Sequence, residues 1–367
     1  MIYLDHGATS MGKPPSVERE MLRALRTCGN PGRGGHRAAM LAAEIVYGCR
    51  EEASRIFDCS PEQVVFTSNC THGLNLAIHT LVKEGSRVVI SGFEHNAVTR
   101  PLYGIGAKVS VAGRRLFDRE ELLEQFDEAL RRGADAAVFT HVSNVFGYIL
   151  PVEELAQLCR RHGVPFAVDA AQAAGSLPVS LSGLGADFIA MPGHKGLLGP
   201  QGTGLLLCGA LPEPLLRGGT GSDSRSFDMP AWLPDGAEAG TLNVPGIAGL
   251  LAGMREVKRM GIPNIARREH AAAKQCAEGL RQLGFRVFSG EAQSGTVSFV
   301  PNTDCEKVAE VLARRGVAVR AGLHCAPLAH ESAGTLETGT VRVSFGHDAS
   351  ARQVQQLLQE LKLAEVM

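Results

Sequence analysis

Lys195 is the residue of this chain whose surroundings most favour covalent chemistry. It ends a stretch, 187–195, that contains the apolar run 188–191, and it opens the glycine-rich turn 196–204. The chain has only eight lysines against 29 arginines. A lysine becomes a nucleophile when burial or a neighbouring cation removes its proton, so an amine beside His194 and between strands suits Schiff-base formation. The same residues also fit a surface turn whose charge points into water.

Polar residues follow the apolar strands that precede Lys195. Small and hydroxyl residues at 67–73 open a helix whose free N–H groups could bind a phosphate, although they also fit a simple helix cap. His95 follows the next strand, where a lone histidine is more often structural than catalytic. Asn144 follows a third strand, and its amide could hydrogen-bond a ring oxygen or a carboxylate.

Asp169 ends another apolar strand, where a buried carboxylate needs a positive partner. A protonated pyridine nitrogen is such a partner, and Gln172 could reach the phenolic oxygen of the same ring. Taken singly, Asp169 also fits a helix N-cap. Together with Lys195 and the other residues at strand ends, these are the groups that pyridoxal 5′-phosphate needs. We therefore expect this cofactor.

The elements that must position these residues alternate between strands and helices. Short apolar strands at 64–67, 87–91, 136–140, 165–169 and 188–191 alternate with amphipathic helices such as 71–83, 118–132 and 152–162. Apolar strands separated by helices predict an α/β fold with a mostly parallel sheet and helices on both faces. Ligands bind beyond the carboxyl ends of such strands, where the polar residues lie.

The pattern changes after about residue 250. Long helical patterns at 249–260 and 262–283 precede short strands at 285–288, 296–299, 317–320 and 341–344, and a final helix is expected at 350–361. We expect a large domain at 15–250 that binds the cofactor, and a smaller α+β domain formed by 1–14 and 251–367. Residues 15–60 should be helical with a break at 28–35.

Composition excludes several classes of protein. A net charge of −1 gives no reason to expect a nucleic-acid or anionic-membrane partner. No apolar run reaches membrane-spanning length, and the amino terminus lacks the basic and apolar parts of a signal peptide, so we expect a cytoplasmic protein. The chain has nine cysteines, an odd number, and no two of them form a Cys-x-x-Cys motif. Both observations argue against a set of disulfides and against a metal site.

With the polar residues at its strand ends and Lys195, the chain resembles the fold-type I pyridoxal-phosphate enzymes of the class V aminotransferase family, in the cysteine desulfurase branch. The resemblance covers nearly the whole chain. The matching motifs are Tyr3-Leu-Asp-His-Gly-Ala-Thr9, 67–73, Glu94-His95, 141–147, 168–172, 193–195, Glu238-Ala-Gly-Thr-Leu-Asn243, 320–325 and 341–344.

The resemblance implies a role for each of these residues. Lys195 would carry the cofactor and move the substrate α-proton, and His95 would stack on the ring and act in proton transfer. The ring would be held by Asp169 at its nitrogen, Gln172 at its hydroxyl, and Cys70, Thr71 and His194 at the phosphate, with Thr241 reaching in from the second subunit of a homodimer. The substrate carboxylate would bind Arg342, assisted by Asn144, with Arg320 as a further candidate.

Cys325 would decide the reaction. By resemblance it attacks the sulfur of cofactor-bound L-cysteine, leaving alanine and an enzyme persulfide, and its short loop matches the SUF-type pattern. Attack requires a thiolate, which charge on His324 or Arg320 would favour. A buried, inert cysteine is the alternative. The persulfide would pass to a sulfur-acceptor protein, in iron–sulfur cluster assembly.

Other functions on the same fold remain open. A selenocysteine lyase or an epimerase would use the same ring contacts without needing Cys325. A non-catalytic sulfur-trafficking subunit would have no physical need for Lys195, Asp169, Arg342 and Cys325 together. The chain also departs from common SUF-type patterns at Gly32, in Asn30-Pro-Gly-Arg33, which affects a contact between subunits. A second departure, Pro192, removes one hydroxyl and one N–H donor from the phosphate site.

Overall fold

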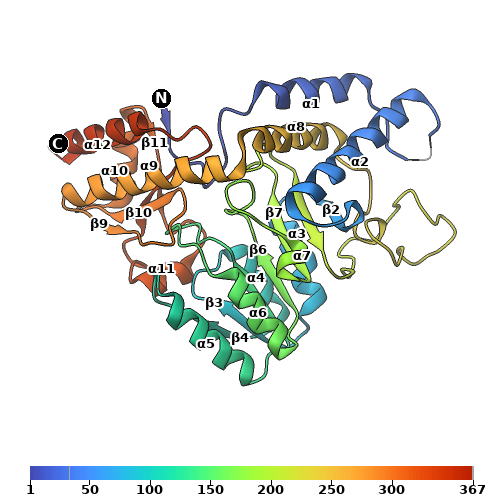
Figure 1. Cartoon of the computed structure of the whole chain (residues 1–367), viewed down its shortest axis with the longest axis horizontal. Coiled ribbons are helices and arrows are strands. Elements are labelled where there is room, and N and C mark those ends of the chain that lie inside the picture. The colour runs from blue at the N-terminus through green and yellow to red at the C-terminus, as the bar shows by residue number, and fades with distance from the viewer. Residues whose placement is uncertain (33, 366–367) are drawn as a thin grey trace.

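The largest sheet of the protein brings together the strands predicted from the apolar runs. The computed structural model describes residues 1–32 and 34–365 (Figure 1). In the described chain this sheet has the strand order β2-β8-β7-β6-β5-β3-β4. The strands are β2 (Val64–Thr67), β3 (Arg87–Ser91), β4 (Lys108–Ala112), β5 (Ala136–Thr140), β6 (Phe166–Asp169), β7 (Phe188–Pro192) and β8 (Gly204–Cys208). Strands β4, β3, β5, β6 and β7 run parallel, and β8 is antiparallel to both of its neighbours, so the mostly parallel sheet is confirmed.

Alternate residues of each strand enter two separate cores. In β7, Ile189 and Met191 pack into one core, whereas Phe188 and Ala190 pack into the other. Helices α3 (Cys70–Leu81) and α4 (Asn96–Ile105) cover the second core, and the first is covered by α2 (Arg37–Phe57), α5 (Arg119–Arg131), α6 (Val152–His162), α7 (Leu181–Leu184) and α8 (Val244–Met260). Both faces of the sheet are therefore buried under helices, as the apolar strands predict.

Helix α1 (Pro15–Thr27) runs alongside α8 (Figure 1). Their contact depends on Gly249, because a Cβ there would lie 2.7 Å from the Met21 side chain. The predicted break at 28–35 separates α1 from α2, and Arg33 lies outside the described residues. Short 3₁₀ turns at η1 (Pro61–Gln63) and η2 (Asp235–Ala237) complete this half of the chain.

The C-terminal part builds its own antiparallel sheet and core. The sheet has the order β12-β13-β10-β9, formed by β9 (Arg286–Phe288), β10 (Thr296–Val300), β12 (Arg320–Gly322) and β13 (Thr340–Ser344). Its core includes residues of α9 (Ile262–Gln282), α10 (Cys305–Arg314) and α12 (Ala351–Glu365). Helix α11 (Pro327–Ala333) follows the Cys325 loop. The fold class is confirmed; the domain boundaries at 15–250 and at 1–14 with 251–367 stay a prediction.

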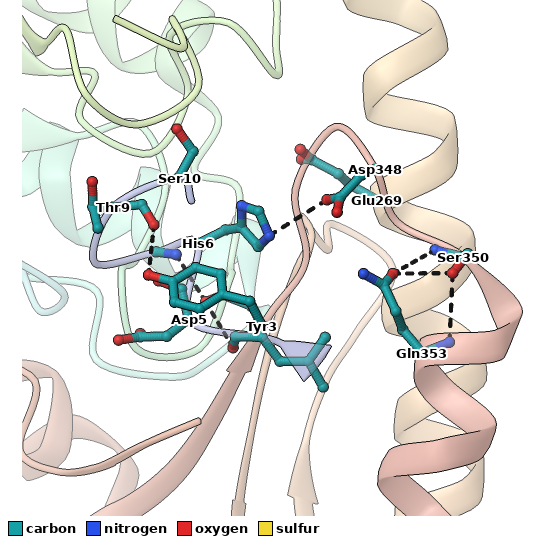
Figure 2. A network of polar contacts seen from close by, with 12 residues as sticks. Tyr3, Asp5, His6, Thr9, Ser10, Glu269, Asp348, Ser350 and Gln353 are labelled. Atoms are coloured by element: carbon teal, nitrogen blue, oxygen red, sulfur yellow. Dashed lines mark hydrogen bonds and ion pairs between the residues drawn. The ribbon is translucent and has the colours of Figure 1, made fainter. Parts of the chain in front are cut away.

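The N-terminal segment joins the small sheet to the Lys195 turn. Strand β1 (Ile2–Tyr3) pairs with β11 (Val317–Ala318), and Leu4 belongs to the C-terminal core. Farther along, the N–H of Ser10 donates to the carbonyl of His194 at 3.1 Å. Within this segment the hydroxyl of Tyr3 donates to the carbonyl of Thr9 at 2.8 Å and so stabilises its conformation (Figure 2). Residues 3–10 therefore span the junction between the two parts of the molecule.

Candidate active site

Asp169 and Cys70 meet at the carboxyl ends of the central strands. Cys70 Sγ donates to Asp169 Oδ1 at 3.5 Å, and the N–H of Ala171 donates to the same oxygen at 2.8 Å. Asp169 is buried, and its Oδ2 accepts no hydrogen bond from the described part of the chain. One carboxylate oxygen is thus fixed by the protein and the other is left for a ligand.

Lys195 follows β7, next to the strand that ends in Asp169. Burial lowers the pKa of its ammonium, and the carboxylate of Asp169 opposes that shift. Lys195 is only partly exposed, and with Gln172 it lines a cavity. This burial favours the nucleophilic amine over the solvated turn.

His95 caps α4 and enters the site as a neutral imidazole. Its Nδ1 accepts from the N–H of Ala97 at 3.0 Å, which places its proton on Nε2. Burial lowers the pKa of His95, with Asp169 opposing and Lys195 adding to the decrease. His95, Thr71 and Cys325 line one hollow on the surface. The structure therefore brings together a proton-bearing imidazole, the start of α3 and the exposed thiol.

Two other predicted cofactor residues are held by the N-terminal segment. Gln172 Nε2 donates to the carbonyl of Gly7 at 3.0 Å, so part of its amide is already engaged. His194 Nδ1 lies 3.0 Å from the hydroxyl of Thr9. Burial, aided by the charge of Lys195, lowers the pKa of His194 to about 4, so it can offer a hydrogen bond but no positive charge.

Arg342 is buried between an acidic residue and a carbonyl. It is 1% exposed, and its Nη2 lies 2.6 Å from Asp5 Oδ1, while Nη1 donates to the carbonyl of Asn144 at 3.1 Å. Its buried Nε and the Oδ1 of Asn144 have no partner within the described residues. Gly7 permits this packing, since a Cβ there would lie 3.1 Å from Arg342 Cζ. The sequence analysis assigns no role to Asp5. Its place in the matching motif Tyr3-Leu-Asp-His-Gly-Ala-Thr9 could have suggested one.

The Cys325 loop is exposed but fixed. His324 and Cys325 both have left-handed φ angles, 51° and 58°, which are uncommon for residues other than glycine. Asn144 Nδ2 donates to the carbonyl of His324 at 2.8 Å, and the N–H of Asn96 donates to the carbonyl of Cys325 at 2.8 Å. Cys325 is the exposed member of the nine free cysteines. The alternative that Cys325 is buried is wrong, and its reactivity stays a prediction.

The expected charge on His324 is also wrong. Its ring is buried and its Nε2 lies 3.2 Å from the carbonyl of Thr340. Burial, with the charge of Arg342, lowers the pKa of His324 to about 2, so the imidazole is neutral and cannot favour a thiolate. Arg320, the other residue expected to favour the thiolate, lies exposed on β12.

Sequence reasoning also passed over Glu94 and His141, which lie beside the strand ends. Glu94 is fully buried and accepts from Ser91 and from the N–H of Thr140, the latter at 2.9 Å. Burial raises the pKa of Glu94 to about 8 and lowers that of His141 to about 4. Both groups are therefore neutral near pH 7. Because Glu94 and His141 lie in the matching motifs 94–95 and 141–147, the sequence could have indicated that they belong to the site.

Thr241 and Gly32 lie on a different surface. Thr241 is exposed and lines a hollow with Gly32 and Arg50, away from the cavity lined by Lys195. A Cβ at Gly32 would meet nothing within 4 Å, so glycine is not sterically required there. Thr241 also lines a second hollow with Ser68 and His72, which belong to the motif 67–73 that opens α3.

These residues fit the cofactor that the resemblance implies. Asp169 Oδ2 is free to pair with a ring nitrogen, Lys195 offers an amine of lowered pKa, and the N-terminus of α3 at Cys70 offers N–H groups to a phosphate. Pro192, which ends β7, adds no hydroxyl to that set. No cluster of His, Cys, Asp and Glu that could hold a metal occurs among the described residues. No helix within residues 1–32 and 34–365 is long and apolar enough to cross a membrane.

The chain is similar to proteins of one family along almost its whole length. The aminotransferase class-V family model matches residues 2–357. A probable cysteine desulfurase of Pyrococcus abyssi is 33% identical over 377 residues, covering 98% of this chain and 92% of that protein. The solved apo structure of a cysteine desulfurase from Thermococcus onnurineus NA1 is 33% identical, with a TM-score of 0.92 over 100% of this chain and 95% of that one. A cysteine desulfurase structure from Escherichia coli is 26% identical, with a TM-score of 0.88, covering 99% and 94%.

Proposed function

The chain belongs to the class V aminotransferase family, and we propose that it is a pyridoxal-phosphate-dependent cysteine desulfurase that captures sulfur on Cys325. The observation that carries this proposal is the Cys325 loop. It holds an exposed thiol in a fixed backbone conformation, in the same hollow as His95. An epimerase would have no use for a thiol presented in this way.

The buried residues at the strand ends would bind and orient the reactants. When bound, the cofactor supplies an electron sink for the carbanion at the substrate α-carbon. Asp169 Oδ2 would hold the proton on the ring nitrogen, and the N–H groups at the start of α3 would hold the phosphate. Arg342 would hold the substrate carboxylate through donors that Asp5 and Asn144 leave available.

Lys195 and Cys325 would divide the chemistry between them. Lys195 Nζ, with its lowered pKa, would take the proton from the α-carbon. The thiolate of Cys325 would attack the substrate sulfur, forming an S–S bond as the carbon–sulfur bond breaks. The electron pair of that bond would go to the carbon, which takes up a proton and becomes the methyl group of alanine. No external oxidant or reductant is needed.

The test is the Cys325→Ser variant. We expect it to bind the cofactor with unchanged visible absorbance but to release alanine from L-cysteine at least about 100-fold more slowly, equivalent to about 2.7 kcal/mol of transition-state stabilisation. The matched control is Cys28→Ser, which changes a partly buried cysteine and should keep full activity.

Other outcomes of this experiment favour the alternatives. Full activity of Cys325→Ser on L-cysteine, with a preference for selenocysteine in the unchanged protein, would make the chain a selenocysteine lyase. Cofactor absorbance without turnover of either amino acid by the unchanged protein would favour a sulfur-trafficking subunit.

The proposed setting is a cytoplasmic homodimer that passes sulfur to an acceptor protein for iron–sulfur cluster assembly. Thr241 lies exposed in a segment, 211–243, that also exposes Leu216, Phe227 and Trp232. A second subunit that covers these side chains would bring its own Thr241 to the site of its partner. The separate cores of the large and the C-terminal sheets support the proposed division at 15–250 and at 1–14 with 251–367.

A further inference from the structure

Cys325 lies against a surface formed by α4. The N–H of Asn96, the first residue of that helix, donates to the carbonyl of Cys325. The hollow beside the thiol is lined by successive turns of both α3 and α4, including Arg100 and Gly104. The exposed thiol therefore shares an open hollow with α3 and α4.

This surface contains unpaired positive charge. Arg100 on α4 and Arg320 on β12 are exposed, and neither side chain forms an ion pair or a hydrogen bond with another described residue. Both charges reach His95, since each contributes to lowering its pKa. Arg100 lines the hollow itself, and Arg320 lies on the strand that leads into the Cys325 loop.

The two helices that line the hollow carry no negative charge to offset these arginines, and Glu84 lies next to Gly106, just beyond the end of α4. Neither α3 nor α4 contains an aspartate or a glutamate, although the chain has 38 acidic residues. On α11, which follows the Cys325 loop, Glu331 is paired with Arg114 at 3.6 Å. The hollow is thus basic where α3 and α4 line it, in a chain whose net charge is −1.

Apolar side chains accompany the charge. Tyr103, on the turn of α4 that follows Arg100, is 88% exposed, and Leu323, in the Cys325 loop, is 38% exposed. Tyrosine and arginine are enriched in protein–protein interfaces, and a small metabolite would not cover side chains that project this far. The composition therefore favours a polypeptide over a small thiol.

We propose that the surface formed by Arg100, Tyr103, Arg320 and Leu323 docks an acidic polypeptide segment that carries the thiol receiving the sulfur. This rests on the proposed function, because it presupposes a persulfide on Cys325. The acceptor thiolate attacks the outer sulfur of that persulfide, so a new S–S bond forms on the acceptor. The bond between the two enzyme-held sulfurs breaks, and its electron pair leaves with Cys325 as a thiolate. No oxidant or reductant is required.

The experiment separates sulfur transfer from persulfide formation. The full-length holoenzyme is first given L-cysteine labelled with ³⁵S, and alanine and protein-bound label are measured in a single turnover. The labelled enzyme is then mixed with short peptides that contain one cysteine flanked either by aspartate and glutamate or by lysine, and loss of label from the enzyme is followed. Dithiothreitol, an uncharged thiol, gives the reference rate.

We expect the acidic peptide to accept sulfur at least about tenfold faster than the basic peptide at low salt, and this difference to collapse at high salt. The Arg100→Glu variant should form persulfide and react with dithiothreitol at unchanged rates but lose the preference for the acidic peptide. The matched control is Arg352→Glu, which makes the same charge change at an exposed, unpaired position on α12.

Two outcomes would overturn the docking proposal: equal rates with the two peptides, or an unchanged preference in Arg100→Glu. A transfer rate to dithiothreitol that exceeds the rate to both peptides would point to a small thiol as the acceptor. Absence of bound label in the unchanged holoenzyme would instead overturn the proposed function, and this result is visible before any acceptor is added.

Discussion

Arg342 is buried beside Asp5 and Asn144, and this position limits how a substrate carboxylate can bind it. Asp5 Oδ1 already occupies Nη2 at 2.6 Å, and the carbonyl of Asn144 occupies Nη1 at 3.1 Å. The buried Nε is the donor left without a partner. A guanidinium has more N–H donors than these two contacts use, so a substrate carboxylate would have to bind the donors that remain beside Asp5 and Asn144.

The Arg342→Lys variant tests this arrangement at the scale of one residue. Lysine keeps the charge beside Asp5 but offers no planar fork, so hydrogen bonds to the substrate carboxylate are lost. Loss of one or more such charged hydrogen bonds costs about 1.5–3 kcal/mol, which should raise KM for L-cysteine by about 10- to 150-fold. The measurement is the rate of alanine release as a function of L-cysteine concentration, with kcat and KM reported separately.

The matched control is Arg320→Lys, which changes the other candidate for the carboxylate. Arg320 is exposed and unpaired, so this variant should change KM much less. A larger increase of KM in Arg320→Lys than in Arg342→Lys would reverse the assignment of the two arginines.

For single residues, the sequence predicts which side chains belong to the site better than it predicts their partners and protonation states. Asp169 and Cys70 were predicted from strand ends, and their side chains do meet. The pairing of Asp5 with Arg342 joins residues 337 positions apart and could not be derived from local spacing. The neutrality of His324 follows from burial by several elements, which no local pattern encodes.

At the scale of elements, a buried ion pair fixes the segment that leads to Thr241. Arg50 on α2 lies 2.6 Å from Glu238, and the guanidinium stacks 4.5 Å from the ring centre of Phe66 on β2. The other oxygen of Glu238 accepts from the N–H of Phe66 at 2.6 Å. Glu238 therefore ties the segment 211–243 to α2 and to the edge strand of the large sheet.

Replacing Glu238 with alanine should destabilise the protein strongly. The change leaves the Arg50 charge buried without its partner, which costs about 3–5 kcal/mol. The comparison is Glu213→Ala, because Glu213 forms an exposed pair with Lys83 at 2.7 Å, and loss of an exposed pair costs about 0–1 kcal/mol. Urea unfolding gives both free energies, and equal losses in the two variants would contradict a structural role for the buried pair.

The regular elements were largely predictable, and the exceptions have physical causes. Apolar runs predicted β2, β3 and β5 with their observed bounds, because such strands are buried on both faces. Helix α4 was not among the expected helices, since it contains Pro101, although its buried Ala97, Val98 and Leu102 form an apolar face. Strand β4 was missed because Lys108, Val109 and Ser110 are exposed at the edge of the sheet.

At the scale of the whole molecule, buried acids and buried imidazoles give opposite contributions to stability as pH changes. Burial lowers the pKa of His141, His324 and His330 to about 4, 2 and 4, so the unfolded chain binds more protons below about pH 6.5. Burial raises the pKa of Glu94 and Glu269 to about 8. At these two residues the folded chain therefore binds more protons than the unfolded chain between about pH 4.3 and about pH 8. Stability from the histidines therefore rises with pH up to about 6.5, whereas stability from the two acids falls with pH up to about 8.

Between about pH 6.5 and about pH 8, where the histidine contribution no longer changes, the free energy of unfolding should decrease as pH rises, by up to about 1.4 kcal/mol per pH unit for each buried acid. The Glu94→Gln variant keeps an oxygen that can accept from Ser91 and Thr140 but removes the titration, so it should reduce the slope by about half. The exposed Glu124→Gln is the control and should leave the slope unchanged. Urea unfolding of the cofactor-free proteins across this pH range gives the slopes. An unchanged slope in Glu94→Gln would show that the buried acid does not hold its proton in the folded state.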